Sequence, residues 1–215
     1  MNAPSLPLVC FAMPQEAKPF QRRSPFHVRT LVTGMGRQNT ERTLAAQLAI
    51  ATPSFVLTCG FAGGLDPALP LNALLFQTAD KPLADRLHNA GARQAQFHCS
   101  PRMAVTAAEK AALRRDTGAD AVEMESAYVH RLCESRGVTC GTLRVISDTA
   151  SEDMPLDFNS LTTAAQGMHF GKLALAIAKS PGTIPGLLRL QRQTAAAAEV
   201  LAGVLGRVIN NITDY

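Results

Sequence analysis

Acidic side chains stand where two predicted elements end, and such groups can move protons. Glu123 and Glu125 come just before a predicted helix, and Asp148 follows the apolar run 138–146. Carboxylates at such joints can converge on one pocket at the edge of a sheet, where ligands usually bind. Each acid also has a structural explanation, because acids favour a helix N-terminus and Ser147-Asp148-Thr149 is typical of a turn. Convergence would suit a hydroxyl-rich substrate.

Glycines form a second pattern beside these acids. Gly60, Gly63 and Gly64 follow the apolar run 55–59, and Gly34 and Gly36 follow the run 28–33. Glycine allows sharp turns and a close approach of backbone to ligand, but segment 60–64 is equally compatible with a plain strand-to-helix turn. Neither segment is a dinucleotide fingerprint or a Walker motif, which argues against a dinucleotide or nucleotide-sugar enzyme.

Apolar runs and helical patterns alternate along the chain and would position these groups. This alternation predicts an α/β fold with a largely buried sheet, as one domain over residues 1–215 with a C-terminal helical extension from about 181. Strands are predicted at 6–12, 28–33, 55–59, 74–76 and 138–146. Helices are predicted at 39–50, 83–90, 106–115, 127–136, 161–179 and 185–210. Thr106, with Glu109 three residues later, has the spacing of a capping box at the start of the helix 106–115.

Composition excludes several classes of protein. With 215 residues, 47% of them hydrophobic and 18% charged, the chain can bury a large core and is not a disordered protein. A net charge of +4 and 5% aromatic residues do not favour nucleic-acid binding. Five scattered cysteines predict free thiols in a reducing, cytoplasmic setting, and no Cys or His spacing predicts a metal site. No signal peptide or membrane-spanning run is evident.

Several segments together resemble a known family. In order they are 12–16 with Glu16, 60–64 after a strand, 122–126 with Glu125, and 144–148 with Asp148. This combination is similar to the purine nucleoside phosphorylase and methylthioadenosine/S-adenosylhomocysteine nucleosidase superfamily. The segments 108–119 and 178–190 further resemble its hopanoid-associated branch, whose members are thought to act on adenosylhopane.

The resemblance implies a single-domain, three-layer phosphorylase/hydrolase-like fold with a central mixed sheet, and an enzyme that cleaves a purine nucleoside by phosphorolysis or hydrolysis. Asp148 matches the acid that protonates the leaving purine, and Glu16 matches the base that activates water. Glu125 matches the acceptor of the ribose hydroxyls, and Met124 would contact the sugar. The remaining expected substrate-binding residues are Glu123, Gly60, Phe61, Ala62, Met103 and Ser147.

Two departures from the family pattern weaken an ordinary phosphate site. Phe61 replaces a small hydroxyl residue, and Thr58 stands where hexameric phosphorylases carry an arginine. Lys18, Arg22 and Arg23 could supply charge, although a solvated basic face explains them more simply. No cofactor is expected, with phosphate as a possible co-substrate. A non-catalytic nucleoside-binding protein on the same fold is the alternative.

The last predicted helix carries an apolar stripe beside arginines. The stripe could be a wall for a lipid-linked nucleoside, a peripheral membrane contact, a homodimer interface or part of the core. The resemblance and the stripe together predict a homodimer. The stripe consists of Val200, Leu201, Val204, Leu205, Val208 and Ile209.

Overall fold

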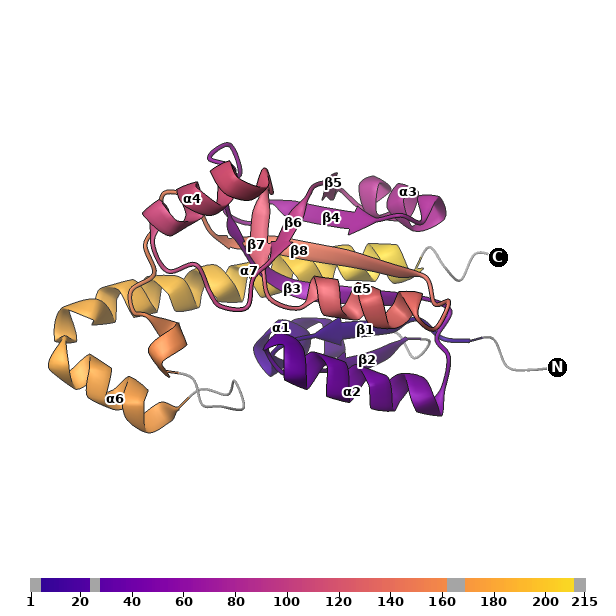
Figure 1. Cartoon of the computed structure of the whole chain (residues 1–215), viewed down its shortest axis with the longest axis horizontal. Coiled ribbons are helices and arrows are strands. Elements are labelled where there is room, and N and C mark those ends of the chain that lie inside the picture. The colour runs from indigo at the N-terminus through magenta and orange to yellow at the C-terminus, as the bar shows by residue number, and fades with distance from the viewer. Residues whose placement is uncertain (1–4, 24–27, 162–168, 211–215) are drawn as a thin grey trace.

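A mixed eight-stranded sheet lies between two layers of helices (Figure 1). The computed structural model describes residues 5–23, 28–161 and 169–210. The strand order is β2-β1-β3-β8-β4-β5, with β7 paired to β3 and β6 paired to β7. The strands are β1 (Leu8–Phe11), β2 (Arg29–Val32), β3 (Val56–Gly64), β4 (Leu74–Thr78), β5 (Arg93–Gln94), β6 (Phe97–Cys99), β7 (Ala121–Glu123) and β8 (Cys140–Asp148). The expected fold class is confirmed.

The directions of the central strands decide where the site lies. β1, β2, β3 and β8 are parallel, so their carboxyl ends meet at one edge of the sheet. β4 runs antiparallel to β8, and β7 runs antiparallel to the end of β3. β3 and β8 each have nine residues and are almost entirely buried, as expected of central strands covered on both faces.

Helices cover both faces of the sheet. α1, α3 and α7 pack on one face around Phe11, Leu57 and Leu143, and α2 and α5 pack on the other around Cys10 and Val56. The helices are α1 (Pro14–Gln21), α2 (Gly36–Ile50), α3 (Lys81–Asn89), α4 (Ala107–Thr117), α5 (Ser126–Glu134), α6 (Phe170–Lys179) and α7 (Ile184–Asn210), with two 3-10 turns, η1 (Phe158–Leu161) and η2 (Pro181–Thr183). Two smaller clusters, around Ile146 and around Leu65, complete the core of the described residues.

Local sequence explains why α4 begins and ends where it does. The Thr106 hydroxyl accepts a hydrogen bond from the Glu109 backbone N–H at 3.1 Å, and the Glu109 carboxylate accepts one from the Thr106 N–H at 3.3 Å. This is the capping box that the sequence predicted. Gly118 ends the helix with a φ of 69°, a left-handed conformation that favours glycine.

The prediction of a turn at segment 60–64 is wrong. These residues continue β3, because Gly60 to Gly63 pair with β8 and Gly63 and Gly64 also pair with β7. The glycines serve close approach instead. A Cβ on Gly60 would lie 2.5 Å from Glu16 Oε1, and a Cβ on Gly63 would lie 3.2 Å from Asp148 Oδ2. Two carboxylates can therefore lie directly against the end of β3.

Three short strands, β5, β6 and β7, were not predicted, because two or three residues are too few to show a period. The predicted helix 161–179 lies partly outside the described residues, and its described part contains α6. The predicted stripe on the last helix packs into the core, where Leu201, Leu205 and Val208 are fully buried. That stripe therefore gives no support for a homodimer.

Candidate active site

A cavity of about 450 Å³ opens where the parallel strands end. Its wall combines the ends of β1, β3 and β8, the joint between β7 and α5, and the first turns of α7. The volume is within the ~300–1,000 Å³ range of small-molecule sites. Residues that are distant in sequence thus share one wall, including Glu16, Glu123, Glu125 and Asp148. The structure brings the expected carboxylates together.

Asp148, at the end of β8, has a buried cation as its partner. Lys110 Nζ on α4 lies 2.5 Å from Asp148 Oδ2, and the two side chains are 0% and 7% exposed. The Ser147 hydroxyl donates to Asp148 Oδ1 at 2.8 Å. Both carboxyl oxygens are therefore held, and the orientation of the group is fixed before a ligand arrives.

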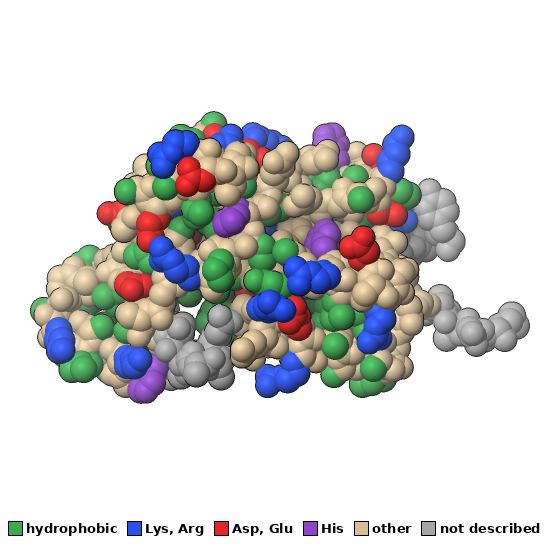
Figure 2. Space-filling view, in the orientation of Figure 1, with side chains coloured by type: hydrophobic (Ala, Val, Ile, Leu, Met, Phe, Trp, Pro, Cys, Tyr) green, Lys and Arg blue, Asp and Glu red, His purple; other side chains and the backbone are tan. Residues whose placement is uncertain are grey.

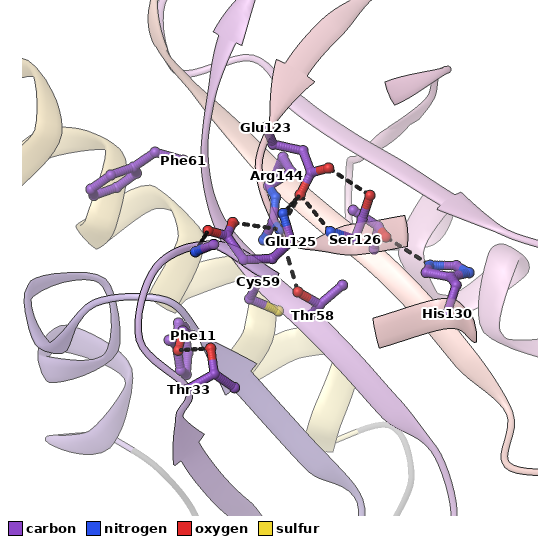
Figure 3. Close-up of polar contacts among 12 residues, drawn as sticks. Phe11, Thr33, Thr58, Cys59, Phe61, Glu123, Glu125, Ser126, His130 and Arg144 are labelled. Carbon is purple, nitrogen blue, oxygen red and sulfur yellow. Dashed lines mark hydrogen bonds and ion pairs between the residues drawn. The ribbon is translucent and has the colours of Figure 1, made fainter. Parts of the chain in front are cut away.

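Arg144, also on β8, is the centre of a second charged group (Figure 3). Its Nη2 donates to Glu123 Oε2 at 2.6 Å and to Thr58 Oγ1 at 3.3 Å, and it lies 3.6 Å from Glu125 Oε2. Burial of the guanidinium would lower its pKa, but Glu123 and Glu125 outweigh this and raise it. We call Glu16, Glu123, Glu125 and Arg144 the Arg144 cluster.

Glu123 belongs to the cavity wall, but its carboxylate is engaged by partners within the protein. Its side chain is 0% exposed, and its carboxylate accepts hydrogen bonds from the Glu125 and Ser126 N–H groups at 3.0 and 2.8 Å. It thereby caps α5, as the structural explanation of this acid suggested. Burial would raise the pKa of Glu123, but the charge and hydrogen bond of Arg144 outweigh burial and lower it.

Glu125 is buried, and its carboxylate lies next to the glycine turn before α2. The Gly36 backbone N–H donates to Glu125 Oε1 at 2.9 Å. Burial raises the pKa of Glu125 to about 7; Arg144 opposes this shift, and the negative charge of Glu123 adds to it. Near neutral pH the group is therefore close to half protonated.

Glu16, on α1, is held by two backbone donors. The Met13 N–H lies 2.8 Å from Glu16 Oε2, and the Phe61 N–H lies 3.0 Å from Oε1. Burial raises the pKa of Glu16, although the Phe61 N–H and Arg144 oppose the shift. A carboxylate with a raised proton affinity is better matched to base catalysis near neutral pH than an exposed one.

The other predicted site residues divide into two groups. Phe61, Ala62, Met103, Met124 and Ser147 line the cavity, whereas Gly60 is not part of its wall. The Phe61 ring lies apart from the polar groups around Arg144 (Figure 3). Asn159 accepts a hydrogen bond from the Met103 N–H at 2.9 Å and donates one to its carbonyl at 3.1 Å.

Sequence reasoning gave no role to Lys110, Arg144, Gly36 or the cavity-lining leucines of α7, Leu187 and Leu190. A charged residue inside an apolar strand, such as Arg144, is a usable signal, because such a group is buried only with partners. Lys110 gives no such signal, since a lysine in an amphipathic helix normally faces solvent. Lys18, Arg22 and Arg23 do not line the cavity, and Arg23 pairs with Glu199.

Within residues 5–23, 28–161 and 169–210, no group of three His, Cys, Asp or Glu side chains is arranged to hold a metal ion. All five cysteines are free thiols. None of the described helices is long and apolar enough to cross a membrane.

Comparison with known proteins agrees with this geometry. Residues 75–179 match the family model described as the phosphorylase superfamily. The resemblance to that superfamily is confirmed. The match supports an enzyme of the nucleosidase or nucleoside phosphorylase class. No curated protein sequence matches the chain.

Solved structures share the fold over almost the whole chain. A 5′-methylthioadenosine/S-adenosylhomocysteine nucleosidase of Helicobacter pylori, with 5′-methylthioadenosine in its active site, is 17% identical, with a TM-score of 0.73 over 97% of this chain and 100% of that one. A futalosine hydrolase of the same organism is 16% identical, with a TM-score of 0.72 over 96% and 99%. A putative nucleosidase from Borrelia burgdorferi, bound to adenine, is 11% identical, with a TM-score of 0.70 over 96% and 100%.

Proposed function

We propose that this protein cleaves the N-glycosidic bond of a purine nucleoside. The observation that carries the proposal is the convergence of Glu16, Glu125 and Asp148 on one cavity at the carboxyl ends of parallel strands. Cleavage of this bond builds positive charge on the ribose and negative charge on the purine. Carboxylates beside the sugar stabilise the positive charge on the ribose, and a proton donor beside the base neutralises the negative charge on the purine.

Each of these three acids has a distinct role in the proposal. Asp148 gives a proton to the leaving purine. Glu125 accepts hydrogen bonds from the ribose hydroxyls and places negative charge near the developing cation, and Met124 contacts the sugar face. Glu16, whose pKa is raised by burial, takes a proton from the attacking water.

The charges on the wall favour water over phosphate as the nucleophile. Glu16, Glu123, Glu125 and Asp148 line the cavity, and among its described wall residues only Arg102 is a cation. Arg102 is already paired with Glu109 at 2.5 Å. A phosphate dianion would enter against this negative charge, whereas neutral water would not. We therefore propose hydrolysis, and phosphorolysis, a glycosyl transfer to phosphate, is the outcome that would overturn this step.

The deciding experiment is product analysis with 5′-deoxyadenosine and 5′-methylthioadenosine, each with and without phosphate. Free adenine and a free ribose product in both conditions support hydrolysis. A sugar 1-phosphate that forms only with phosphate supports phosphorolysis. Binding of the nucleoside without release of adenine would leave the non-catalytic alternative.

We further propose a substrate with an apolar 5′ substituent, with a lipid-linked nucleoside such as adenosylhopane as the candidate. Leu187 and Leu190 of α7 line the cavity together with Met154 and Phe158. These side chains offer no charge and would bind a hydrocarbon group by burial. Leu190→Asn should weaken use of a 5′-alkylthio adenosine more than use of 5′-deoxyadenosine. Deletion of everything after Ser180 would be uninformative, because it removes the buried core residues of α7.

We also propose that α6 and the start of α7 touch an anionic membrane surface from the cytoplasmic side. These helices project away from the sheet (Figure 1). Three of the four large apolar side chains that are exposed among the described residues lie there: Leu175, Ile184 and Leu188, at 56%, 42% and 47% exposure. Residues 169–198 also carry four Lys or Arg and no acid. Basic and apolar side chains mix over this lobe, at the lower left of Figure 2.

Vesicle sedimentation tests this surface contact. The protein should bind vesicles that contain phosphatidylglycerol and not vesicles of phosphatidylcholine alone, because the cations need anionic lipid. Leu188→Asp should abolish binding, whereas the control Ile50→Asp, on an exposed residue of α2, should not. The alternative partner for this exposed surface is a second copy of the chain, in keeping with the homodimer that the family resemblance implies. That alternative would be favoured if light scattering showed that the wild-type protein is a dimer and that the Leu188→Asp variant is a monomer.

A further inference from the structure

Lys110 is a buried lysine directly behind the cavity. Its side chain is 0% exposed although it stands on α4, a helix whose other charged side chains are not buried. The ammonium uses all three of its N–H groups, toward Asp148 Oδ2 at 2.5 Å, the Thr149 carbonyl at 2.7 Å and the Glu152 carbonyl at 2.9 Å. The group is therefore fully satisfied and cannot turn elsewhere.

A buried ion pair such as that of Lys110 and Asp148 contributes little net stability to the fold. Moving an ammonium and a carboxylate out of water costs free energy that their attraction often only balances, and apolar residues of similar size commonly do as well or better. Met would fill the same space on α4 without a charge. The presence of an ion pair at the edge of the cavity therefore indicates that Lys110 has a role in the chemistry of Asp148.

We propose that Lys110 is the positioning residue for Asp148. It fixes the carboxyl group and stabilises the negative charge that Asp148 acquires when its proton passes to the leaving purine. This inference rests on the proposed function. Asp148 first takes up a proton from solvent. In the step, its O–H bond breaks, an N–H bond forms on the purine, and the C–N bond to ribose breaks with its electrons moving to the purine. Water adds to the ribose carbon and gives its proton to Glu16, and Asp148 returns to the carboxylate that pairs with Lys110. Lys110 contributes its charge and gives up no proton.

The surroundings of Lys110 support positioning. Its two carbonyl partners belong to the loop after β8, which is held in shape by Glu152. The Glu152 carboxylate accepts hydrogen bonds from the Thr149 N–H at 2.8 Å and from Gln193 Nε2 on α7 at 3.0 Å. Lys110 thus joins Asp148 to a loop that is itself anchored to the helix lining the cavity. A displaced ammonium would release both the carboxyl group and the loop.

The test compares K110M, D148N and the double variant K110M/D148N, with K81M as the control on an exposed lysine of α3. With 5′-deoxyadenosine, K110M should lower kcat by about tenfold or more, equivalent to ~1.4 kcal/mol. The double variant should be no slower than D148N, because Lys110 acts only through Asp148. The double variant also removes both charges together, so its interior stays neutral even where K110M alone fails to fold.

A second substrate separates positioning from general damage. The leaving group of 4-nitrophenyl β-D-ribofuranoside departs as an anion and needs no proton, so K110M should spare its cleavage. Equal losses on both substrates, or a double variant slower than D148N by the full K110M factor, would overturn the inference while the proposed function stands. A wild-type protein that releases no adenine would instead overturn the proposed function itself.

Discussion

Asp148 has one buried cation to itself, whereas Glu16, Glu123 and Glu125 share Arg144. On the Asp148 side, one ammonium at 2.5 Å balances one carboxylate. In the Arg144 cluster, one guanidinium faces three carboxylates, and Glu123 takes the closest contact at 2.6 Å. The pKa values follow: burial raises those of Glu16 and Glu125, the latter to about 7, while Arg144 overcomes burial and lowers that of Glu123.

This difference shows how carboxyl groups in one cavity can have different chemical roles. Groups whose surroundings push their proton affinities apart can serve as acid, base and electrostatic partner within a few ångströms. Glu123 remains charged and holds Arg144 and α5 in place. Glu125, with a pKa of about 7, keeps access to a proton near neutral pH, and burial also raises the pKa of Glu16. Asp148, with its own cation, forms a stabilised carboxylate after it has protonated the purine.

Removal of the acid on the Asp148 side should have the largest effect. Asp148→Asn keeps the shape of the side chain and loses the transferable proton, so kcat for a purine nucleoside should fall by about 10²-fold or more. Steady-state release of adenine measures this. The control Asp116→Asn alters a surface carboxylate that is 66% exposed and should leave kcat unchanged. Near-normal turnover in a folded Asp148→Asn protein would remove Asp148 from the mechanism.

In the Arg144 cluster, Glu125→Gln should impair ribosides far more than it impairs the binding of free adenine, since adenine carries no ribose hydroxyls. Wild-type kcat/KM should also rise with pH through about 7, because only the ionised Glu125 accepts hydrogen bonds from both hydroxyls. This rise of kcat/KM with pH should be absent in the Glu125→Gln variant. Glu134→Gln, on the exposed side of α5, is the matched control. An equal loss for riboside and adenine would indicate a structural role.

The close contact between Gly60 and Glu16 of the Arg144 cluster can be tested with Gly60→Ala. The new Cβ would lie 2.5 Å from Glu16 Oε1, which is the movable end of a side chain. We expect Glu16 to be displaced, with turnover falling by about tenfold, or ~1.4 kcal/mol. Gly203→Ala adds a Cβ in open space on α7 and should change nothing. Normal activity in the Gly60→Ala variant would indicate that Glu16 takes no part in the reaction.

The pH dependence of stability should show the unbalanced charge of the Arg144 cluster without any assay of activity. The folded-state pKa of Glu125, about 7, lies above the ordinary value of 4.5 for an exposed glutamate, so between these values the folded protein binds more protons than the unfolded one. Stability must then fall as pH rises from about 4.5 to 7, by ~3 kcal/mol for this group. Glu125→Gln should flatten the dependence of melting temperature on pH. An unchanged slope in the variant would show that Glu125 does not keep its proton.

The sequence predicted the elements with clear periods and the acids that follow them. The apolar runs that became β1, β3 and β8 were found, and so was the capping box of Thr106 and Glu109. The segment 60–64 was misread, because glycines usually mark turns, whereas here pairing with β7 and β8 keeps them extended. Lys110 was missed because a lysine in an amphipathic helix normally faces solvent.

By itself the sequence determined that Glu125 and Asp148 stand at the ends of elements, since local patterns set where strands and helices begin and end, whereas Glu16 was found through the family resemblance. It could not assign their counterions. Lys110 reaches Asp148 across 38 positions and Arg144 reaches Glu123 across 21, so only the packing of α4, β7 and β8 brings these charges together. Proton affinity depends on burial and on nearby charge, and both are properties of the tertiary structure.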